Sequence, residues 1–273
     1  MNALEERTRA LKARGKKALV PFFTAGFPDE ETFLRLVADA AGAAGCPVVE
    51  VGVPFSDPIA DGPVIQESSK AALERGITLR RTLELARRAA ERTRAALVLM
   101  GYLNPLLRMG VGAFARAARE AGVAGVIVPD LPVEESGGVR RTLAGEGIVL
   151  VDLLAPTSGP ERIAAAAGEA RGFLYLVSIT GVTGARSPEA ADTAAFVARV
   201  RAHTDLPLYV GFGIKNPELA AAAAKSADGV IAGSALIRCI REAPSREAAV
   251  DRVRALLEDM QAAMEAAEEE RAP

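Results

Sequence analysis

Histidine is almost missing from this sequence, because His203 is the only one among 273 residues. It stands in RAHTDLP, at the end of an expected helix and on the amino-terminal side of an expected strand. A histidine-based metal site and a histidine acid-base pair are therefore excluded. The six lysines all lie outside the expected strands, so a Schiff-base lysine facing the centre of the fold is not expected either.

The sequence also has few cysteines, no long apolar run and little net charge. Cys46 and Cys239 are the two cysteines, too few and too far apart for a disulfide framework, and both are interpreted as buried thiols. No apolar run approaches the ~20 residues of a membrane span, and the charged amino terminus does not resemble a secretory signal. A net charge of -2 argues against a nucleic-acid surface. The sequence predicts a cytoplasmic enzyme or binding protein with no nucleic-acid or membrane partner.

What the sequence does contain is a regular alternation of short β-branched runs with stretches of helical period rich in Ala, Glu and Arg. This alternation is typical of parallel strands joined by crossover helices. Eight strand candidates follow one another: ALVPFFTA from Ala18, PVVEVG from Pro47, ALVLMGY from Ala96, GVIVPD from Gly125, IVLVDLLA from Ile148, FLYLVS from Phe173, PLYVGFG from Pro207 and GVIAGS from Gly229.

Eight such units in about 250 residues predict an α/β fold, a single (β/α)8 TIM barrel domain over residues 1–273. An extra helix precedes the first strand, additional helices follow strands 2 and 8, and the acidic tail from about residue 268 is expected to fray. An open doubly wound sheet is the alternative. It would place G-x-G-x-x-G after its first strand, where this chain has TAGFPDEE.

Glycine-rich turns follow the last three expected strands, in SITGVTGAR, VGFGIKNPE and IAGSALIR. Any one of them is most simply a tight turn. Their recurrence at the strand ends where barrels commonly hold phosphate predicts an anion site instead. Its members are expected to be Gly184, Gly213, Gly233 and Ser234.

The segment from Glu50 to Gln66, EVGVPFSDPIADGPVIQ, contains the most informative acidic residues. An ionisable group such as Glu50 inside an apolar strand is costly unless it is paired or used, although a solvated position on the outer face stays possible from strand alternation alone. Asp57 and Asp61 stand among prolines and glycine, where aspartate is usually a turn former, and this explanation fits Asp57 better than Asp61.

The ordered set of motifs resembles the alpha subunits of tryptophan synthase. The resemblance rests on the Glu50 segment together with PFFTAGFPD, GYLNP, PDLPVEES, LLAPTS, TGVTG, GFGI and GSA, which span nearly the whole chain. It implies cleavage of indole-3-glycerol phosphate to indole and glyceraldehyde 3-phosphate without a cofactor. A phosphosugar isomerase or synthase of the same barrel superfamily, and a non-catalytic barrel that only binds a partner, are the alternatives.

The resemblance also implies roles for residues. Glu50 would be the mobile general acid and base, and Asp61 would stay ionised and hold the indole N–H. Tyr175 would orient Glu50 or the glycerol hydroxyl, and Thr183 would approach Asp61 when the SITGVTGAR loop closes as a mobile lid. The remaining substrate contacts are expected at Phe22, Met100, Tyr102 and Phe212.

A partner is implied as well, a beta subunit that carries pyridoxal phosphate in an α2β2 complex. The expected contact residues are Pro54, Asp57, Asn104, Asp130 and Pro132. One residue departs from the family pattern, because Asp152 stands in IVLVDLLAP where an apolar residue is usual. If Leu153 faces the pocket, Asp152 faces the helix layer and needs a nearby hydrogen-bond donor.

Overall fold

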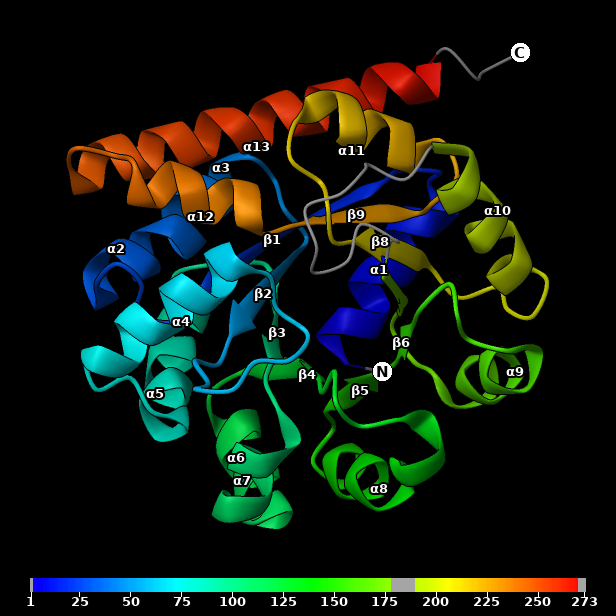
Figure 1. Cartoon of the computed structure of the whole chain (residues 1–273), viewed down its shortest axis with the longest axis horizontal. Coiled ribbons are helices and arrows are strands. Elements are labelled where there is room, and N and C mark those ends of the chain that lie inside the picture. Colours follow the sequence, from blue (N-terminus) through cyan, green and yellow to red (C-terminus); the bar gives the residue numbers. More distant parts are fainter. Residues whose placement is uncertain (1, 178–189, 270–273) are drawn as a thin grey trace.

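The core of the fold is one parallel sheet that lies inside a ring of helices (Figure 1). The computed structural model describes residues 2–177 and 190–269. Within these two ranges the strand order is β5-β4-β3-β2-β1-β9-β8-β7-β6. The strands are β1 (Ala18–Thr24), β2 (Val48–Gly52), β3 (Ala96–Met100), β4 (Val123–Ile127), β5 (Val149–Val151), β6 (Leu153–Leu154), β7 (Leu174–Val177), β8 (Leu208–Gly211) and β9 (Gly229–Ala232).

The sheet closes into a barrel at a single residue. β5 pairs with β4 at one end of the strand order and β6 pairs with β7 at the other, yet only Asp152 separates β5 from β6 in the chain. The Asp152 carbonyl accepts a hydrogen bond of 3.0 Å from the backbone N–H of Tyr175. The predicted TIM barrel is therefore confirmed, and its fifth strand is divided into two short pieces.

The side chain of Asp152 points out of the barrel, toward the helix layer. It is buried, and its Oδ1 accepts a hydrogen bond of 2.6 Å from Arg140 of helix α8. The same guanidinium contacts the carbonyls of Leu150 and Glu169 and the Ser136 hydroxyl. The donor that the sequence required for Asp152 is thus present in the neighbouring helix.

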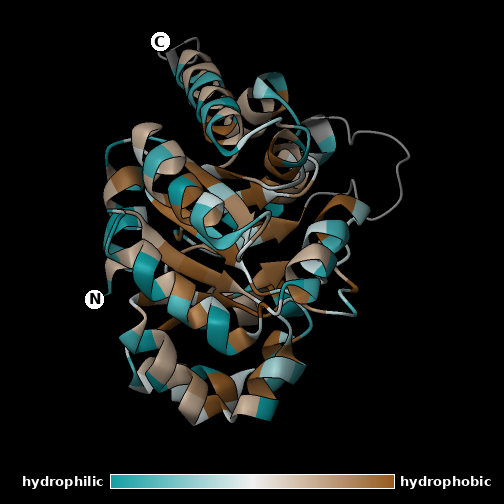
Figure 2. Cartoon of the chain, turned by 90° about the vertical axis from the view of Figure 1, so that its left-hand side faces the viewer, coloured by the Kyte–Doolittle hydropathy of each residue, from teal (hydrophilic) through white to brown (hydrophobic). Residues whose placement is uncertain are grey.

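The outer layer consists of helices, apolar toward the sheet and polar outside, as the brown strands and mixed helices of Figure 2 show. The α-helical segments are α1 (Ala3–Ala13), α2 (Glu30–Arg35), α3 (Ala41–Ala43), α4 (Pro63–Glu74), α5 (Leu79–Ala90), α6 (Leu103–Met109), α7 (Val111–Glu120), α8 (Gly137–Gly145), α9 (Pro160–Glu169), α10 (Ala190–Arg201), α11 (Pro217–Ala224), α12 (Ser234–Arg241) and α13 (Arg246–Glu269). The π-helical segment η1 (Leu36–Ala40) joins α2 to α3, and the 3₁₀ segment η2 (Val133–Glu135) precedes α8.

Local sequence signals explain where several helices begin. The side chains of Asn2, Asp29 and Thr78 each accept a hydrogen bond from a backbone N–H in the first turn of the helix that follows. Such N-caps satisfy donors that would otherwise have no partner. Proline occupies the first position of α4, α9 and α11, where its missing N–H is not needed.

Helix α1 lies across the amino-terminal end of the barrel, in the middle of the ring in Figure 1. The Asn2 amide donates to the carbonyls of Ala124 and Gly147, and the Thr8 hydroxyl donates to that of Gly172. Leu4, a residue of α1, is fully buried. The extra amino-terminal helix of the prediction is therefore confirmed, and it covers the end of the barrel opposite the carboxyl ends of the strands.

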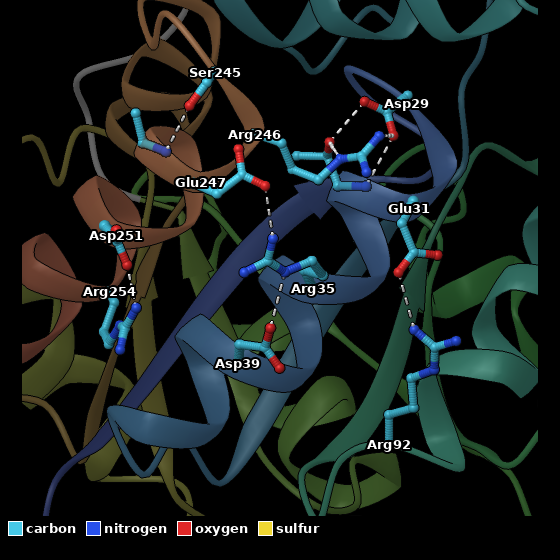
Figure 3. A network of polar contacts seen from close by, with 12 residues as sticks. Asp29, Glu31, Arg35, Asp39, Arg92, Ser245, Arg246, Glu247, Asp251 and Arg254 are labelled. Atoms are coloured by element: carbon cyan, nitrogen blue, oxygen red, sulfur yellow. Dashed lines mark hydrogen bonds and ion pairs between the residues drawn. The ribbon is translucent and has the colours of Figure 1, made fainter.

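The long helix α13 packs against α11, α12 and η1. Figure 3 shows the ion pairs at one end of it, where Glu247 contacts Arg35 of α2 at 3.3 Å and Arg246 contacts Asp29 at 3.3 Å. These side chains are partly exposed to solvent, which screens their charges, so the ion pairs contribute little to stability. The apolar contacts of Val250, Val253 and other buried α13 residues hold the helix in place.

Most predicted elements lie where the sequence placed them, with small differences. The fourth strand begins at Val123, two residues earlier than predicted, and additional helices follow β2 and β9 as expected. Cys46 is buried, but Cys239 is only half-buried, so the prediction of two buried thiols is wrong for the second. In the described residues no helix is both long and apolar enough to cross a membrane.

Candidate active site

Glu50 occupies the middle of β2 and is 1% exposed. Neither carboxylate oxygen has a hydrogen-bond partner in the described chain. Burial, and to a smaller degree the negative charge of Asp61, raises the pKa of Glu50 to about 8. A carboxyl group held in this way is protonated near neutral pH and has no structural partner.

The effect of the Glu50 charge on the pKa of Tyr175 shows which way the Glu50 side chain points. Tyr175 lies on β7, four positions away from β2 in the sheet order, and its buried hydroxyl has a pKa raised first by burial and then by the charges of Glu50 and Asp61. Strands so far apart in the order face each other only across the barrel. Glu50 therefore points into the barrel, which strand alternation had left open.

Asp61 lies in the loop between β2 and α4. It is 9% exposed, and its backbone carbonyl accepts a hydrogen bond of 2.8 Å from the Gln66 side chain. Burial raises its pKa to about 6, and a hydrogen bond from Tyr102 opposes this rise by stabilising the carboxylate. The two carboxyl groups of the site thus sit in different environments, and Asp61 ionises at a lower pH than Glu50.

Tyr102 fixes the loop that carries Asp61. Its hydroxyl accepts a hydrogen bond of 3.0 Å from the Ala60 N–H and donates to Asp61, and its ring stacks on Phe55 at 5.0 Å between centroids. Tyr102 directly follows β3 and Gly101. The sequence predicted a substrate contact at Tyr102, which stays a prediction, and the structure shows in addition that Tyr102 orders the loop over the barrel mouth.

Aromatic rings fill the space above three glycines at strand ends. A Cβ atom at Gly52 would approach the Phe22 ring to 2.4 Å, and one at Gly211 would approach the Tyr175 hydroxyl to 2.2 Å. Phe22 also lies against Gly233, where an added Cβ would be 3.4 Å from the Phe22 Cβ and 3.5 Å from its ring. Close approach of ring and backbone therefore depends on glycine at Gly52 and Gly211.

The apolar residues predicted for the substrate lie together around these rings. Phe22 is aligned with Glu50 across the β1–β2 pair, so both point inward. Met100 is aligned with Gly52 across the β2–β3 pair and is 6% exposed. The ring of Phe212 meets Tyr175 edge to face, at 5.9 Å between centroids. These side chains form an apolar wall next to the carboxyl groups.

The glycine turns after the last two strands lie at neighbouring strand ends, because β8 and β9 are adjacent in the sheet. Phe212 and Gly213 both have left-handed backbone, with φ of 69° and 80°. Gly233 precedes α12 and Ser234 is its first residue, so free backbone N–H groups face the barrel mouth. Thr183 and Gly184, with the whole of the predicted SITGVTGAR lid, lie outside the described residues.

The expected partner-contact residues differ in exposure. Asp57 and Asn104 are exposed, Pro132 is half-buried, and Pro54 is buried within the chain and offers little surface. The Asp130 carboxylate accepts a hydrogen bond of 2.9 Å from the first N–H of α6, at Leu103, and so has a local role. Sequence reasoning missed two exposed apolar side chains near them, Ile59 at 76% and Leu107 at 54%.

In the part of the chain that the structure describes, no group of three or more His, Cys, Asp or Glu side chains could hold a metal ion. His203 follows α10 and precedes β8, on the amino-terminal side of that strand as predicted. The site thus lies toward the carboxyl ends of the barrel strands. It combines two buried carboxyl groups, an apolar wall and glycine turns that lead into helices. This combination defines a (β/α)8-barrel enzyme with two buried carboxyl groups at its mouth.

Comparison with known proteins identifies the family. The family profile described as tryptophan synthase alpha chain matches residues 8–265. A tryptophan synthase alpha chain of Laribacter hongkongensis is 48% identical over 269 residues, covering 97% of this chain and 100% of the relative. One of Citrifermentans bemidjiense is 50% identical over 238 residues, with 87% and 89% covered.

Solved structures agree. The crystal structure of tryptophan synthase subunit alpha from Legionella pneumophila str. Paris superimposes with a TM-score of 0.89 at 39% identity, covering 97% of this chain and 99% of that one. A tryptophan synthase structure from Mycobacterium tuberculosis gives 0.86 at 38% identity, with 96% and 97% covered. The chain belongs to the tryptophan synthase alpha family. Its members are lyases of tryptophan biosynthesis that cleave indole-3-glycerol phosphate to indole and glyceraldehyde 3-phosphate.

Proposed function

We propose that Glu50 transfers the protons of this retro-aldol cleavage. The observation that carries the proposal is a buried carboxyl group that faces the barrel interior, has no hydrogen-bond partner among the described residues and has a pKa of about 8. Protonated Glu50 donates its proton to indole C3. This protonation interrupts the aromaticity of the five-membered ring and prepares the bond between C3 and the glycerol phosphate chain for cleavage. The resulting carboxylate accepts the proton of the glycerol hydroxyl as the aldehyde forms, so one residue serves as acid and then as base.

Asp61 is proposed to hold the indole N–H as a carboxylate and to stabilise the positive charge that develops on the ring nitrogen. Its pKa of about 6 leaves it ionised at neutral pH, while the pKa of about 8 leaves Glu50 protonated. Both residues are in the required states between about pH 6 and pH 8. Two carboxyl groups held in opposite states by their surroundings are the usual solution for acid-base chemistry near neutral pH.

The rest of the substrate is proposed to bind around these groups. Phe22, Met100 and Phe212 would enclose the indole ring, and Tyr175 would orient Glu50 or the glycerol hydroxyl. The phosphate would bind the backbone N–H groups and hydroxyl of the glycine turns, at Gly184, Gly213, Gly233 and Ser234. Thr183 would approach Asp61 when its loop closes. Tyr102 would contribute by holding the Asp61 loop in place, and the reaction would need no cofactor bound to this chain.

The test is Glu50→Gln, which keeps the shape of the side chain and removes its proton. Indole release should fall by at least about 10²- to 10⁴-fold, whereas binding of a non-cleavable substrate analogue should stay within a few-fold. Asp57→Asn is the matched control, because Asp57 is an exposed carboxylate on the Asp61 loop and should keep its activity. A Glu50→Gln protein with more than about a tenth of normal turnover would show that another group transfers the proton.

A beta subunit that binds pyridoxal phosphate is the proposed partner, in an α2β2 complex. The proposed contact surface consists of exposed or half-buried residues near the barrel mouth: Asp57, Ile59, Asn104, Leu107, Asp130 and Pro132. Exposed apolar side chains such as Ile59 and Leu107 are typical of a surface that a partner covers. Pro54 would act from beneath this surface, by shaping the loop.

Sedimentation with the beta subunit tests this surface. Ile59→Asp should weaken association at least tenfold, because it places a charge in the apolar centre of the contact. Ala262→Asp, an equally exposed position on α13, is the control and should associate normally. Equal association of both variants would move the contact elsewhere. We further propose that the whole chain is one barrel domain and that it works in the cytoplasm, where its two unpaired cysteines stay reduced.

A further inference from the structure

A cavity of about 610 Å³ lies at the amino-terminal end of the barrel, the end opposite the site described above. Its walls are one flank of α1 and the two segments that lead into β2 and β3, residues 42–47 and 93–95. Ala10, Leu11, Cys46 and Pro47 give it an apolar lining. The volume falls in the range of small-molecule sites, which is roughly 300–1,000 Å³.

The cavity lies beside the flank of α1 that makes no hydrogen bond to the described part of the barrel, because the hydrogen bonds between α1 and the barrel come from its other flank. Asn2, Thr8 and Lys12 donate hydrogen bonds to a carbonyl in β4 and to carbonyls in the segments before β5, β7 and β8. Among the described residues no hydrogen bond or ion pair joins α1 to residues 42–47 or 93–95. No polar contact between described residues therefore closes the side of the helix that faces β2 and β3, and the open space lies there.

Three arginines line this space, and protein carboxylates do not neutralise them. The buried Nε–H of Arg7 has no hydrogen-bond partner in the described chain, and Arg14 bonds only to the Ala10 carbonyl of its own helix. Arg94 forms no ion pair in the part of the chain that the structure describes. Glu6 is the one acidic residue among the lining residues, so the cavity keeps an excess of positive charge.

We propose that this cavity binds a small organic anion whose apolar body rests on the alanine, leucine and proline lining. A carboxylate or phosphate matches the forked donors of a guanidinium, and the partnerless Nε–H of Arg7 supplies one of them. Aliphatic side chains beside the arginines favour an anion with a ring or short chain over an inorganic ion. The inference does not depend on the roles proposed for Glu50 and Asp61.

Calorimetric titration of the full chain with benzoate and with phenyl phosphate tests the site. Saturating glycerol phosphate is present throughout, so that the phosphate-binding turns at the barrel mouth are occupied. Both anions should bind with saturation, and neutral benzyl alcohol should bind at least tenfold more weakly than benzoate. Arg7→Gln and Arg94→Gln should each weaken benzoate binding at least tenfold. Arg9→Gln is the matched control, because Arg9 lies on the same helix but outside the cavity.

Two further measurements make the outcome decisive. Circular dichroism and indole release should be unchanged in all three variants, and Arg94 is exposed, so its replacement leaves the core intact. Ala10→Trp, which fills the cavity from an exposed position, should abolish benzoate binding while indole release persists. Absence of saturable binding at millimolar concentrations would overturn the proposal. So would equal affinity in the Arg7, Arg9 and Arg94 variants, or equal binding of benzoate and benzyl alcohol.

Discussion

The burial of Glu50 makes the stability of the protein depend on pH, and Glu50→Gln should remove that dependence. The folded protein holds the Glu50 proton with a pKa of about 8, whereas an unfolded chain holds it with the ordinary value of 4.5. Folding therefore strengthens proton binding. The stability that protonated Glu50 contributes is fully present below pH 4.5 and is lost as the pH rises through about 8.

The expected size follows from the two pKa values. The whole difference corresponds to roughly 5 kcal/mol of unfolding free energy, at about 1.4 kcal/mol for each tenfold change in proton affinity. Asp61, with a pKa of about 6, shows the same direction of change at lower pH. Between pH 6 and pH 9 the Glu50 contribution alone should fall by about 3 kcal/mol. Asp61 should add less than about 1 kcal/mol over that interval.

Urea unfolding followed by circular dichroism, at half-unit steps from pH 6 to pH 9, measures the effect. The difference in unfolding free energy between wild type and Glu50→Gln should change by about 3 kcal/mol over the series, because all other groups contribute equally to both proteins. Glu258→Gln, at an exposed position on α13, should run parallel to wild type. Parallel curves for wild type and Glu50→Gln would refute the reasoning and place Glu50 in contact with water or with a cation.

Three further predictions concern other parts of the structure. Arg140→Met should lower the unfolding free energy by about 3–5 kcal/mol in urea titrations, because it leaves the Asp152 carboxylate buried without its partner; the double variant with Asp152→Leu should recover most of this loss. Tyr102→Phe should move the acidic limb of the kcat/KM profile to higher pH, since Asp61 loses a hydrogen bond that lowers its pKa; an unmoved limb would contradict the assignment. Gly233→Val should weaken glycerol phosphate binding at least tenfold by calorimetry if the phosphate approaches this backbone, and normal binding by a folded variant would place the anion elsewhere.

The sequence predicted the barrel because every strand is a short and mostly apolar run, and few folds bury eight such parallel strands between helices. It did not predict the division of the fifth strand at Asp152, since a residue pointing outward between two inward neighbours leaves the apolar pattern intact. The outward position becomes visible only with Arg140, which lies 12 residues away on a helix.

The candidate site shows a similar limit. The motifs located Glu50 and Asp61, but the phase of a strand with apolar residues on both faces does not reveal which face holds Glu50. Its orientation becomes visible only from the effect of the Glu50 charge on the pKa of Tyr175 across the barrel. The role of Tyr102 in ordering the loop was not predicted, because its contacts to Ala60 and Asp61 join it to a loop some forty residues earlier in the chain.

The aromatic rings packed over Gly52 and Gly211 limit the substitutions that the barrel mouth can accept. Phe22 and Gly52 occupy what is in effect one shared volume, as do Tyr175 and Gly211, although each pair is contributed by two different strands. A larger residue at either glycine is compatible with the fold only if the opposite ring shrinks. Variation at the barrel mouth must therefore occur in coupled steps. A library that randomises one position at a time would miss the reshaped pockets that a paired substitution opens.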